Sequence, residues 1–251
     1  EPVSFTTGIC DLATAGGQGS LIRLADAALR WGKRHGRDVC WIYDPKIVDV
    51  TEVHEMDRDF ERAPALAGLQ ALSRAIDAKD HMTREHSERV AMLATRLARV
   101  LGWKSERIEM LENAALVHDV GKIGVPDAIL LKPGPLDLDE YEVIKQHASL
   151  GAQIVEGVLS SEQVEWVRSH HERPDGRGYP NGLIGPSISE GATLLAMADA
   201  FDSMTAARVY GEPKDIDAAI RECHDLAGRQ FAREAVKALG IVYEQGALRA
   251  R

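Results

Sequence analysis

Histidine and aspartate side chains in the middle of the chain have the types and spacing of a metal site. The centre of this set is the adjacent pair His118-Asp119, which lies in an otherwise apolar helical stretch. Burying these groups without a partner is costly, and imidazole and carboxylate are both ligands that divalent metals accept. The pair alone could equally be a partly exposed histidine beside an aspartate at a helix end. The metal interpretation gains support from further histidines at helix-like positions, namely His86, His147, His170 and His171.

The spacing of these residues indicates two metal ions. Adjacent residues on a helix point about 100° apart, so the doublet His170-His171 is expected to serve two different ions. Asp119 could bridge the ions with its two oxygens, and Asp199 could complete the second. Two ions about 3.5–4 Å apart are the usual arrangement for phosphoester hydrolysis. Any one of the histidines could instead be an ordinary core or surface residue.

Two features downstream could complete such a site. A glycine-rich loop at residues 173–180 contains Tyr179, and its glycines permit backbone conformations that side chains forbid. An ordinary surface turn is the alternative for this loop. Asp202 follows Asp199 by about one helical turn and can face the same site, where we expect it to orient a histidine.

Composition fits a soluble protein and limits its partners. The 251 residues are 45% hydrophobic and 27% charged, which allows a real core. A net charge of −9 argues against a DNA- or RNA-binding surface, although bound metal ions would still permit a phosphate ligand. Three widely spaced cysteines indicate reduced thiols and a cytoplasmic location. No apolar run could span a membrane, so no membrane contact is expected within this chain, although an upstream sensor or anchor in a longer protein is compatible with a chain that begins at Glu1.

The hydrophobic periodicity predicts a mainly helical fold after a small α/β fragment. Residues 1–50 are expected to form strand, helix and strand, at 3–7, 21–35 and 39–43. Residues 51–63 are charged and are expected to be a linker or the start of a helix. About seven helices are expected in residues 64–251, with His86 in the middle of one of them. Candidate helix caps are Asp137 or Asp139 and Ser160 or Ser161.

Longer motifs in this region resemble one known family. H-D-V-G-K-I-G-V-P-D from His118, K-Q-H ending at His147, and H-H-E-R-P-D-G-R-G-Y-P from His170 are similar to the HD-GYP phosphodiesterases of the HD superfamily. D-x-x-T-x-x-H-S-x-R-V from Asp80 and A-D-x-F-D-S-M-T-x-x-R-x-Y from Ala198 fit the same family.

The resemblance covers residues 64 to about 236 and implies a metal-dependent enzyme that hydrolyses cyclic di-GMP to the linear dinucleotide or on to GMP. It implies two divalent transition-metal ions, with iron or manganese favoured and zinc or nickel as alternatives. The implied metal ligands are His86, His118, Asp119, His147, His170, His171 and Asp199. The implied catalytic residues are Asp119 and Lys122. The implied substrate contacts are Lys122 and Arg208, one for each phosphate, together with Tyr179 and Asp202.

Three positions depart from the family pattern. Gly211 stands where members often carry a basic residue, which bears on substrate affinity. Gln230-Phe231 is followed by Ala232 instead of the usual aspartate, so a helix cap is lost. Met82 stands where some members place a glutamate that binds a third metal. Because a thioether is a poor ligand for Fe²⁺ or Mn²⁺, we expect two ions and not three.

A second, shorter resemblance concerns the N-terminal fragment. Residues 25–39, A-D-A-A-L-R-W-G-K-R-H-G-R-D-V, are similar to the closing segment of GGDEF diguanylate cyclase domains, so residues 1–50 are expected to be a non-catalytic remnant of one. A homodimer or a GGDEF-domain partner follows as an expectation. For the helical domain, a non-catalytic cyclic-dinucleotide receptor and an HD phosphohydrolase acting on another nucleotide remain the alternatives to a cyclic di-GMP phosphodiesterase.

Overall fold

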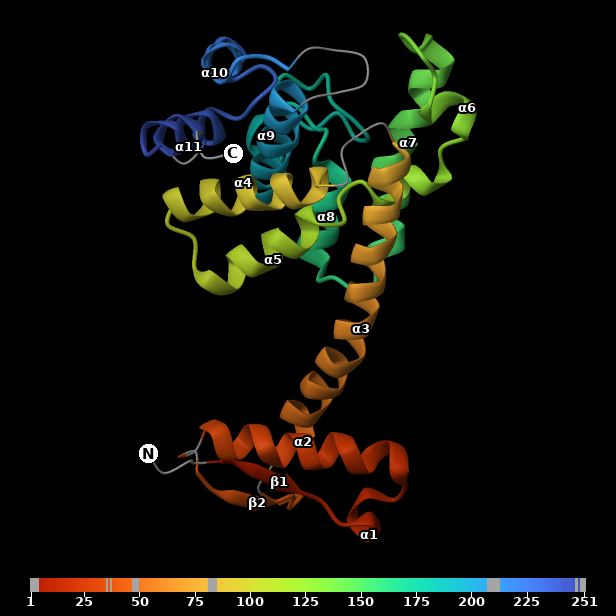
Figure 1. The fold of residues 1–251 in the computed structure, drawn as a ribbon, viewed down its shortest axis with the longest axis vertical. Helices are drawn as coiled ribbons and strands as arrows, with labels where there is room; N and C mark the ends of the chain where they lie inside the picture. Colours follow the sequence, from red (N-terminus) through yellow and green to blue (C-terminus); the bar gives the residue numbers. More distant parts are fainter. Residues whose placement is uncertain are drawn as a thin grey trace. The chain divides into compact units, whose positions relative to one another are not determined.

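A computed structural model describes residues 5–34, 36, 38–46, 50–80, 85–206, 213–246 and 248. The described chain contains eleven α-helices, two 3-10 helices and two short strands (Figure 1). This confirms the mainly helical class. The chain divides into two compact units, Glu1–Ala65 and Leu66–Arg251. Three residues singled out from the sequence, Met82, Arg208 and Gly211, lie outside the described residues.

The first unit contains a pair of parallel strands packed on a helix. Strand β1 (Thr7–Ile9) pairs with β2 (Cys40–Ile42), and α1 (Leu12–Ala15) and α2 (Gln18–Arg34) lie between them in sequence. Strand β1 overlaps the strand predicted at 3–7 only at Thr7, whereas β2 lies inside the strand predicted at 39–43. Residues 1–4 are not described. At Gly8, a Cβ atom would lie 2.0 Å from the carbonyl oxygen of Ala25, so the close packing of β1 on α2 requires glycine there.

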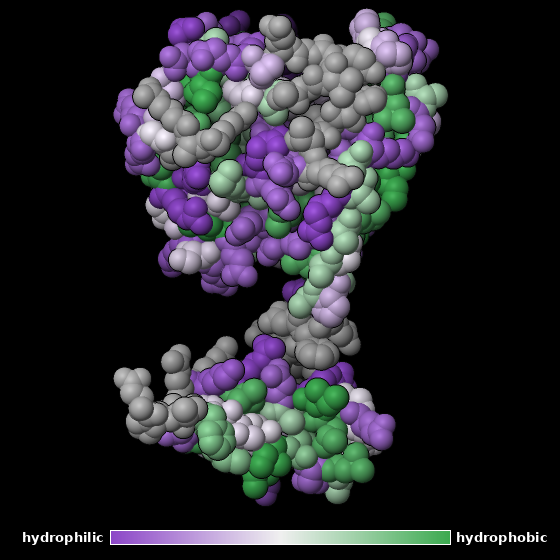
Figure 2. All heavy atoms as spheres, viewed as in Figure 1, coloured by the Kyte–Doolittle hydropathy of each residue, from purple (hydrophilic) through white to green (hydrophobic). Residues whose placement is uncertain are grey.

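Apolar side chains are exposed on this small unit. Phe5 is 73% exposed, and Ile9 and Ile42 are also exposed. Figure 2 shows hydrophobic residues (green) lying beside one another on the visible face of the unit. Parallel strands are usually covered on both faces, so this sheet is less covered than its type normally is.

Helix α3 (Val50–Lys79) contains the boundary between the two units. Residues 51–63, for which a linker or the start of a helix was expected, are helical. The helix also contains Pro64, which removes one backbone hydrogen bond. Within the described part of the chain, no helix is both long and apolar enough to span a membrane.

The second unit is a helical bundle built around α9 (Glu190–Thr205). Helix α4 (His86–Val100) packs against α9 and against α5 (Ser105–Ala115), and α8 (Ser161–Ser169) packs against both α5 and α9. The largest fully buried apolar side chains are Leu97, Leu111, Trp166, Leu194, Leu195, Met197 and Leu239. They come from five different helices and form one contiguous core.

The described part of this unit has six further helical elements, and several of them also contribute to the core. They are η1 (Val120–Gly124), α6 (Asp127–Leu130), α7 (Leu138–Val155), η2 (Gly185–Ser187), α10 (Ile216–Asp225) and α11 (Arg233–Glu244). Asp137 caps α7 and Ser160 caps α8, each in a reciprocal capping box with the residue three positions later. These two caps confirm candidates read from the sequence.

Candidate metal centre

The structure brings all seven predicted metal ligands together at the ends and faces of five helices. His86 is the first residue of α4 and not the middle of a helix, which corrects the sequence prediction. The pair His118-Asp119 lies in the turn between α5 and η1. The other ligands are His147 on α7, His170 and His171 directly after α8, and Asp199 on α9. The bundle core packs these elements together, so their side chains converge away from water.

A close backbone contact fixes the His118-Asp119 turn against α7. A Cβ atom on Gly121 would lie 2.0 Å from the carbonyl oxygen of His147 and 2.4 Å from the nitrogen of Gly151. Only glycine permits η1 to approach α7 this closely. The approach brings Asp119 to His147.

Three histidines of the centre are oriented in the same way. The Nδ1 atoms of His118, His147 and His170 lie 2.8, 2.7 and 2.6 Å from a backbone carbonyl oxygen. These carbonyls belong to the residues three positions earlier, Ala115, Ile144 and Val167. A carbonyl oxygen can only accept, so each Nδ1 donates and each Nε2 keeps a free lone pair. The three rings therefore present their metal-binding nitrogens.

The ligand atoms form two groups that share Asp119. One group is Asp119, His147, His170 and His171, and the other is His86, His118 and Asp119; within each group the ligand atoms lie within 4.8 Å of one another. Oδ1 of Asp119 is 3.3 Å from Nε2 of His147, and Oδ2 is 3.5 Å from Nε2 of His118. The carboxylate thus offers one oxygen to each group, as a bridging ligand does.

Asp199 lies beside the second group. Its Oδ1 is 3.4 Å from Nε2 of His86 and 4.0 Å from Nε2 of His118. Asp199 therefore lies next to the second group, and its part in an ion site stays a prediction.

The doublet His170-His171 differs from the sequence expectation. Both residues belong to the same ligand group, and their ring centroids are 4.0 Å apart. The angle of about 100° between neighbours holds inside an α-helix, but α8 ends at Ser169. Beyond that point the backbone leaves the helix, and the two rings converge.

Buried atoms without partners show that the residues fit metal ions. Nε2 of His86, Nε2 of His118 and Oδ1 of Asp119 are buried and have no hydrogen-bond partner among the described residues. Orphaned buried polar atoms are rare and destabilising, and ions bound in the two ligand groups would satisfy all three. A set of imidazoles and carboxylates without thiolates suits Fe²⁺, Mn²⁺, Zn²⁺ and Ni²⁺.

Asp202 contacts the Nδ1 side of the His86 ring, away from Nε2. Its Oδ2 is 2.8 Å from Nδ1 of His86, and both its oxygens accept hydrogen bonds from Arg89, at 2.6 and 2.9 Å. Burial raises the pKa of Asp202, but His86 and Arg89 outweigh it and lower the pKa below its usual value. Asp202 is 4% exposed and does not line the cavity described below. We therefore interpret Asp202 as a residue that orients His86, and we do not retain it as a substrate contact.

Weakening this support should weaken metal binding. Asp202→Asn keeps the shape of the side chain but removes the negative charge between His86 and Arg89. Because groups that orient metal ligands typically contribute 10- to 100-fold to affinity, metal affinity should fall by about that factor. Competition with a chelator measures it, and Asp139→Asn, an exposed change on α7, is the matched control. Equal affinities in the two variants would contradict the role given to Asp202.

The charge states of the other ligands suit a cation. Burial raises the pKa of Asp119, but Lys122 and His118 hold it well below its usual range. Burial lowers the pKa of His170 well below its usual value and that of His171 to about 3, helped by neighbouring histidines. Burial also lowers the pKa of His86, but Asp199 and Asp202 outweigh it and raise the pKa to about 10. A metal ion at His86 would replace a proton held by these carboxylates.

Lys122 is held at the edge of the centre by two carboxylates. Its Nζ lies 2.7 Å from Oδ2 of Asp119 and 2.7 Å from Oδ2 of Asp80, which directly follows α3. Burial lowers the pKa of Lys122, but these two carboxylates outweigh it and raise it, so the amine stays charged. The sequence analysis quoted Asp80 within a motif but gave it no role. Its position next to Lys122 becomes visible only in the fold.

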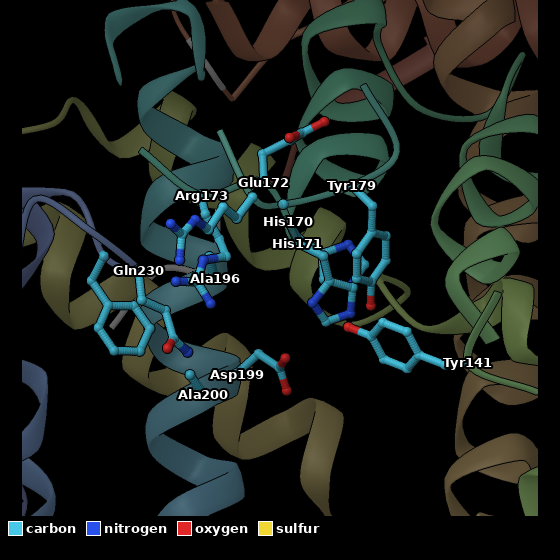
Figure 3. Close-up of a pocket in the computed structure, with 13 residues that line it drawn as sticks. Tyr141, His170, His171, Glu172, Arg173, Tyr179, Ala196, Asp199, Ala200 and Gln230 are labelled. Atoms are coloured by element: carbon cyan, nitrogen blue, oxygen red, sulfur yellow. The ribbon is translucent and has the colours of Figure 1, made fainter. Parts of the chain in front are cut away.

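A cavity of about 280 Å³ opens beside the ligands (Figure 3). His170, His171 and Asp199 form its metal side. Tyr179, a predicted substrate contact, also lines it, with its ring centroid 4.8 Å from that of His171. The ring of Tyr141 stands edge-on to Tyr179 at 6.3 Å. The cavity can therefore bring a bound molecule to the ligand cluster.

Glu172 holds the glycine-rich loop in place, a role the sequence analysis missed. Its two carboxylate oxygens accept hydrogen bonds from the backbone nitrogens of Asn181 and Leu183, at 2.6 and 2.9 Å. At Gly178, a Cβ atom would lie 2.4 Å from the nitrogen of Arg173. The available signal in the sequence was a carboxylate directly after two candidate ligands, because such a group needs partners when it is buried.

Comparison with known proteins identifies the family. The model of the HD domain family matches residues 70–234. The chain belongs to the HD domain family. The solved structure of Bd1817 from Bdellovibrio bacteriovorus, described as an HDG"Y"P protein, covers 74% of this HD domain chain with a TM-score of 0.55 and 20% identity, and is itself covered over 63% of its length. That likeness supports the fold.

Two curated relatives of this HD domain protein are phosphodiesterases by name. The "Cyclic di-GMP phosphodiesterase" of Thermotoga maritima is 39% identical over 173 residues, which are 68% of this chain and 47% of the relative. The "3'3'-cGAMP-specific phosphodiesterase 2" of Vibrio cholerae is 36% identical over 171 residues, which are 67% of this chain and 33% of the relative. The HD domain chain therefore spans less than half the length of either relative.

Proposed function

We propose that this HD domain protein is a metal-dependent phosphodiesterase that hydrolyses cyclic di-GMP to linear pGpG or on to GMP. The observation that carries the proposal is the Asp119 carboxylate, which is shared between two groups of histidine ligands beside an open cavity. A bridging carboxylate with imidazoles on both sides is the arrangement of two-metal hydrolases. The relative from Thermotoga maritima supports cyclic di-GMP as the substrate.

The protein's own groups have separate parts in this reaction. When bound, a pair of divalent ions supplies Lewis acidity at neutral pH. The carbonyl-bound Nδ1 atoms keep His118, His147 and His170 in the ligating tautomer throughout. Lys122 provides a fixed positive charge near Asp119 for the non-bridging phosphoryl oxygens. Tyr179 forms the wall against which the dinucleotide lies.

Removing the charge of Lys122 should slow the reaction itself. Lys122→Met keeps the aliphatic stem, and kcat for cyclic di-GMP should fall about 10²- to 10³-fold, as when one preorganised oxyanion donor is lost. KM should change less, because the charge acts on the reacting phosphoryl group. Steady-state kinetics separate the two constants, with exposed Lys237→Met on α11 as control. Unchanged constants in Lys122→Met would remove this lysine from the mechanism.

Other sequence predictions stay predictions. Arg208, expected at the second phosphate, lies outside the described residues. Iron and manganese remain the favoured ions, with zinc or nickel as alternatives. Only sequence patterns support four further predictions. These are the GGDEF-like remnant, a homodimer, a GGDEF-domain partner and the cytoplasmic location.

The activity has a direct test. The chain is purified without oxygen, loaded with Mn²⁺ or Fe²⁺, and incubated with cyclic di-GMP, and the products are separated by chromatography. We expect pGpG or GMP to form only with metal bound. A metal-loaded protein that binds cyclic di-GMP without cleaving it would instead be a receptor, the main alternative. Parallel incubation with 3'3'-cGAMP is justified by the relative from Vibrio cholerae.

A further inference from the structure

The cavity beside the metal centre has two ends of different chemistry. In Figure 3, Tyr141 and Tyr179 lie on one side, and Arg173 and Gln230 lie on the other, with Asp199 between them. The catalytic proposal uses the ligand cluster and Tyr179. It gives no role to the end formed by Arg173 and Gln230.

Arg173 is held at this end of the cavity and keeps unused N–H donors. Its Nε and Nη2 donate to the two carboxylate oxygens of Asp175, at 3.1 and 2.7 Å. This two-pronged pair fixes the plane of the guanidinium. It uses two of the five N–H groups, and Nη1 has no acceptor among the described residues. The arginine therefore presents a rigid edge of donors.

Gln230 offers complementary groups at the same end. It lies in the loop between α10 and α11, where its backbone nitrogen donates to the carbonyl oxygen of Leu226 at 3.0 Å. Its side-chain amide has no hydrogen bond within the described residues, and Figure 3 shows it at the cavity. An amide has both an acceptor and two donors, so it can pair with a ligand edge that carries donors.

Apolar side chains also line the cavity beside these polar groups. Ala196 and Ala200 lie one turn apart on α9 and line the cavity, as does Phe231, which is nearly fully buried. Methyl groups and an aromatic ring suit the face of a flat heterocycle. Apolar lining residues together with a few polar groups match a nucleobase.

We propose that the end of the cavity formed by Arg173, Gln230, Ala196 and Ala200 is a guanine-binding subsite. The inference rests on the proposed function, because it places one base of the dinucleotide substrate there. Guanine O6 and N7 accept from arginine donors, and the Gln230 carbonyl can accept from its N1–H or 2-amino group. Adenine carries an amino donor in place of O6, which would face the donors of Arg173. The subsite therefore selects guanine over adenine.

Equilibrium binding of mononucleotides tests the subsite without any hydrolysis. The metal-loaded protein is titrated with GMP and with AMP, and GMP should bind about ten-fold more tightly, the value of one good base contact. Gln230→Leu should reduce that preference to about two-fold or less, since one of the two reading groups is lost. The control is Gln153→Leu, an exposed change on α7, which should keep the wild-type preference. Equal binding of GMP and AMP by the wild-type protein, or full preference in Gln230→Leu, would overturn the proposal.

A second variant tests the apolar surface independently. Ala196→Leu retains helix-forming tendency but fills the space above α9, so GMP affinity should fall about ten-fold. The kcat/KM for cyclic di-GMP should fall relative to that for bis(p-nitrophenyl) phosphate, a diester without a base. An unchanged ratio together with unchanged GMP affinity would overturn the subsite.

The two proposals fail separately. Hydrolysis of cyclic di-GMP without any preference for GMP over AMP would support the proposed activity and refute the guanine subsite. A preference for GMP over AMP in a metal-loaded protein that cleaves neither diester would support the guanine subsite and refute the proposed activity.

Discussion

Asp119→Ala is expected to reduce cyclic di-GMP hydrolysis by about three orders of magnitude or more, because residues acting as one catalytic unit have effects of that size. One carboxylate contributes an oxygen to each ligand group, at 3.3 Å from His147 and 3.5 Å from His118. Its loss would therefore remove a candidate ligand from both groups at once. Steady-state turnover and bound metal are measured on the same preparation.

The control for this variant is Asp139→Ala, which removes an exposed carboxylate from the first turn of α7. It should keep wild-type turnover and metal content. Circular dichroism should show both variants folded, since Asp119 contacts ligand side chains and Lys122 and not the apolar core. Turnover of Asp119→Ala within ten-fold of wild type would refute a bridging role.

Gly121→Ala is expected to destabilise the helical unit strongly. The new methyl group would lie 2.0 Å from the carbonyl oxygen of His147 and 2.4 Å from the nitrogen of Gly151, so η1 must move away from α7. Overpacking of this kind costs about 3 kcal/mol, which corresponds to a fall in Tm of about 10 °C for a chain of this size. The same movement separates Asp119 from His147, so metal content should fall as well.

Thermal unfolding followed by circular dichroism measures this effect. The matched control is Gly68→Ala in α3, where a Cβ atom meets nothing within 4 Å. That change should be neutral or slightly stabilising, because alanine favours a helix more than glycine does. A Tm of Gly121→Ala close to that of Gly68→Ala would show that the backbone contact at His147 is not required.

The helical character predicted for residues 64–251 followed from the sequence because the apolar residues there repeat with the helical period. Capping followed from local chemistry as well, since Asp137 and Ser160 both form capping boxes with a Glu or Gln three residues later. The start of α4 was harder to predict from the sequence. Nothing in the sequence near His86 shows that the helix begins there, because its cap position, Glu85, makes no side-chain capping bond.

The candidate ligands could be picked out from residue types in ordered motifs, but their geometry could not. The convergence of His170 and His171 depends on where α8 ends, which is decided by packing and not by the doublet. The partners Asp80 and Glu172 are likewise set by tertiary contacts, with Lys122 and with the loop after Tyr179. Sequence periodicity reports faces of helices, whereas these contacts depend on how the helices end and meet.

The most direct test of the two-metal account is hydrolysis of cyclic di-GMP as a function of metal bound per chain. Metal-free protein is titrated with Fe²⁺ or Mn²⁺ without oxygen, and bound ions and initial rate are measured at each step. We expect little activity at one ion per chain and a steep rise to a plateau at two, because both ligand groups share Asp119. Full activity with a single bound ion, or none with two, would contradict a binuclear phosphodiesterase.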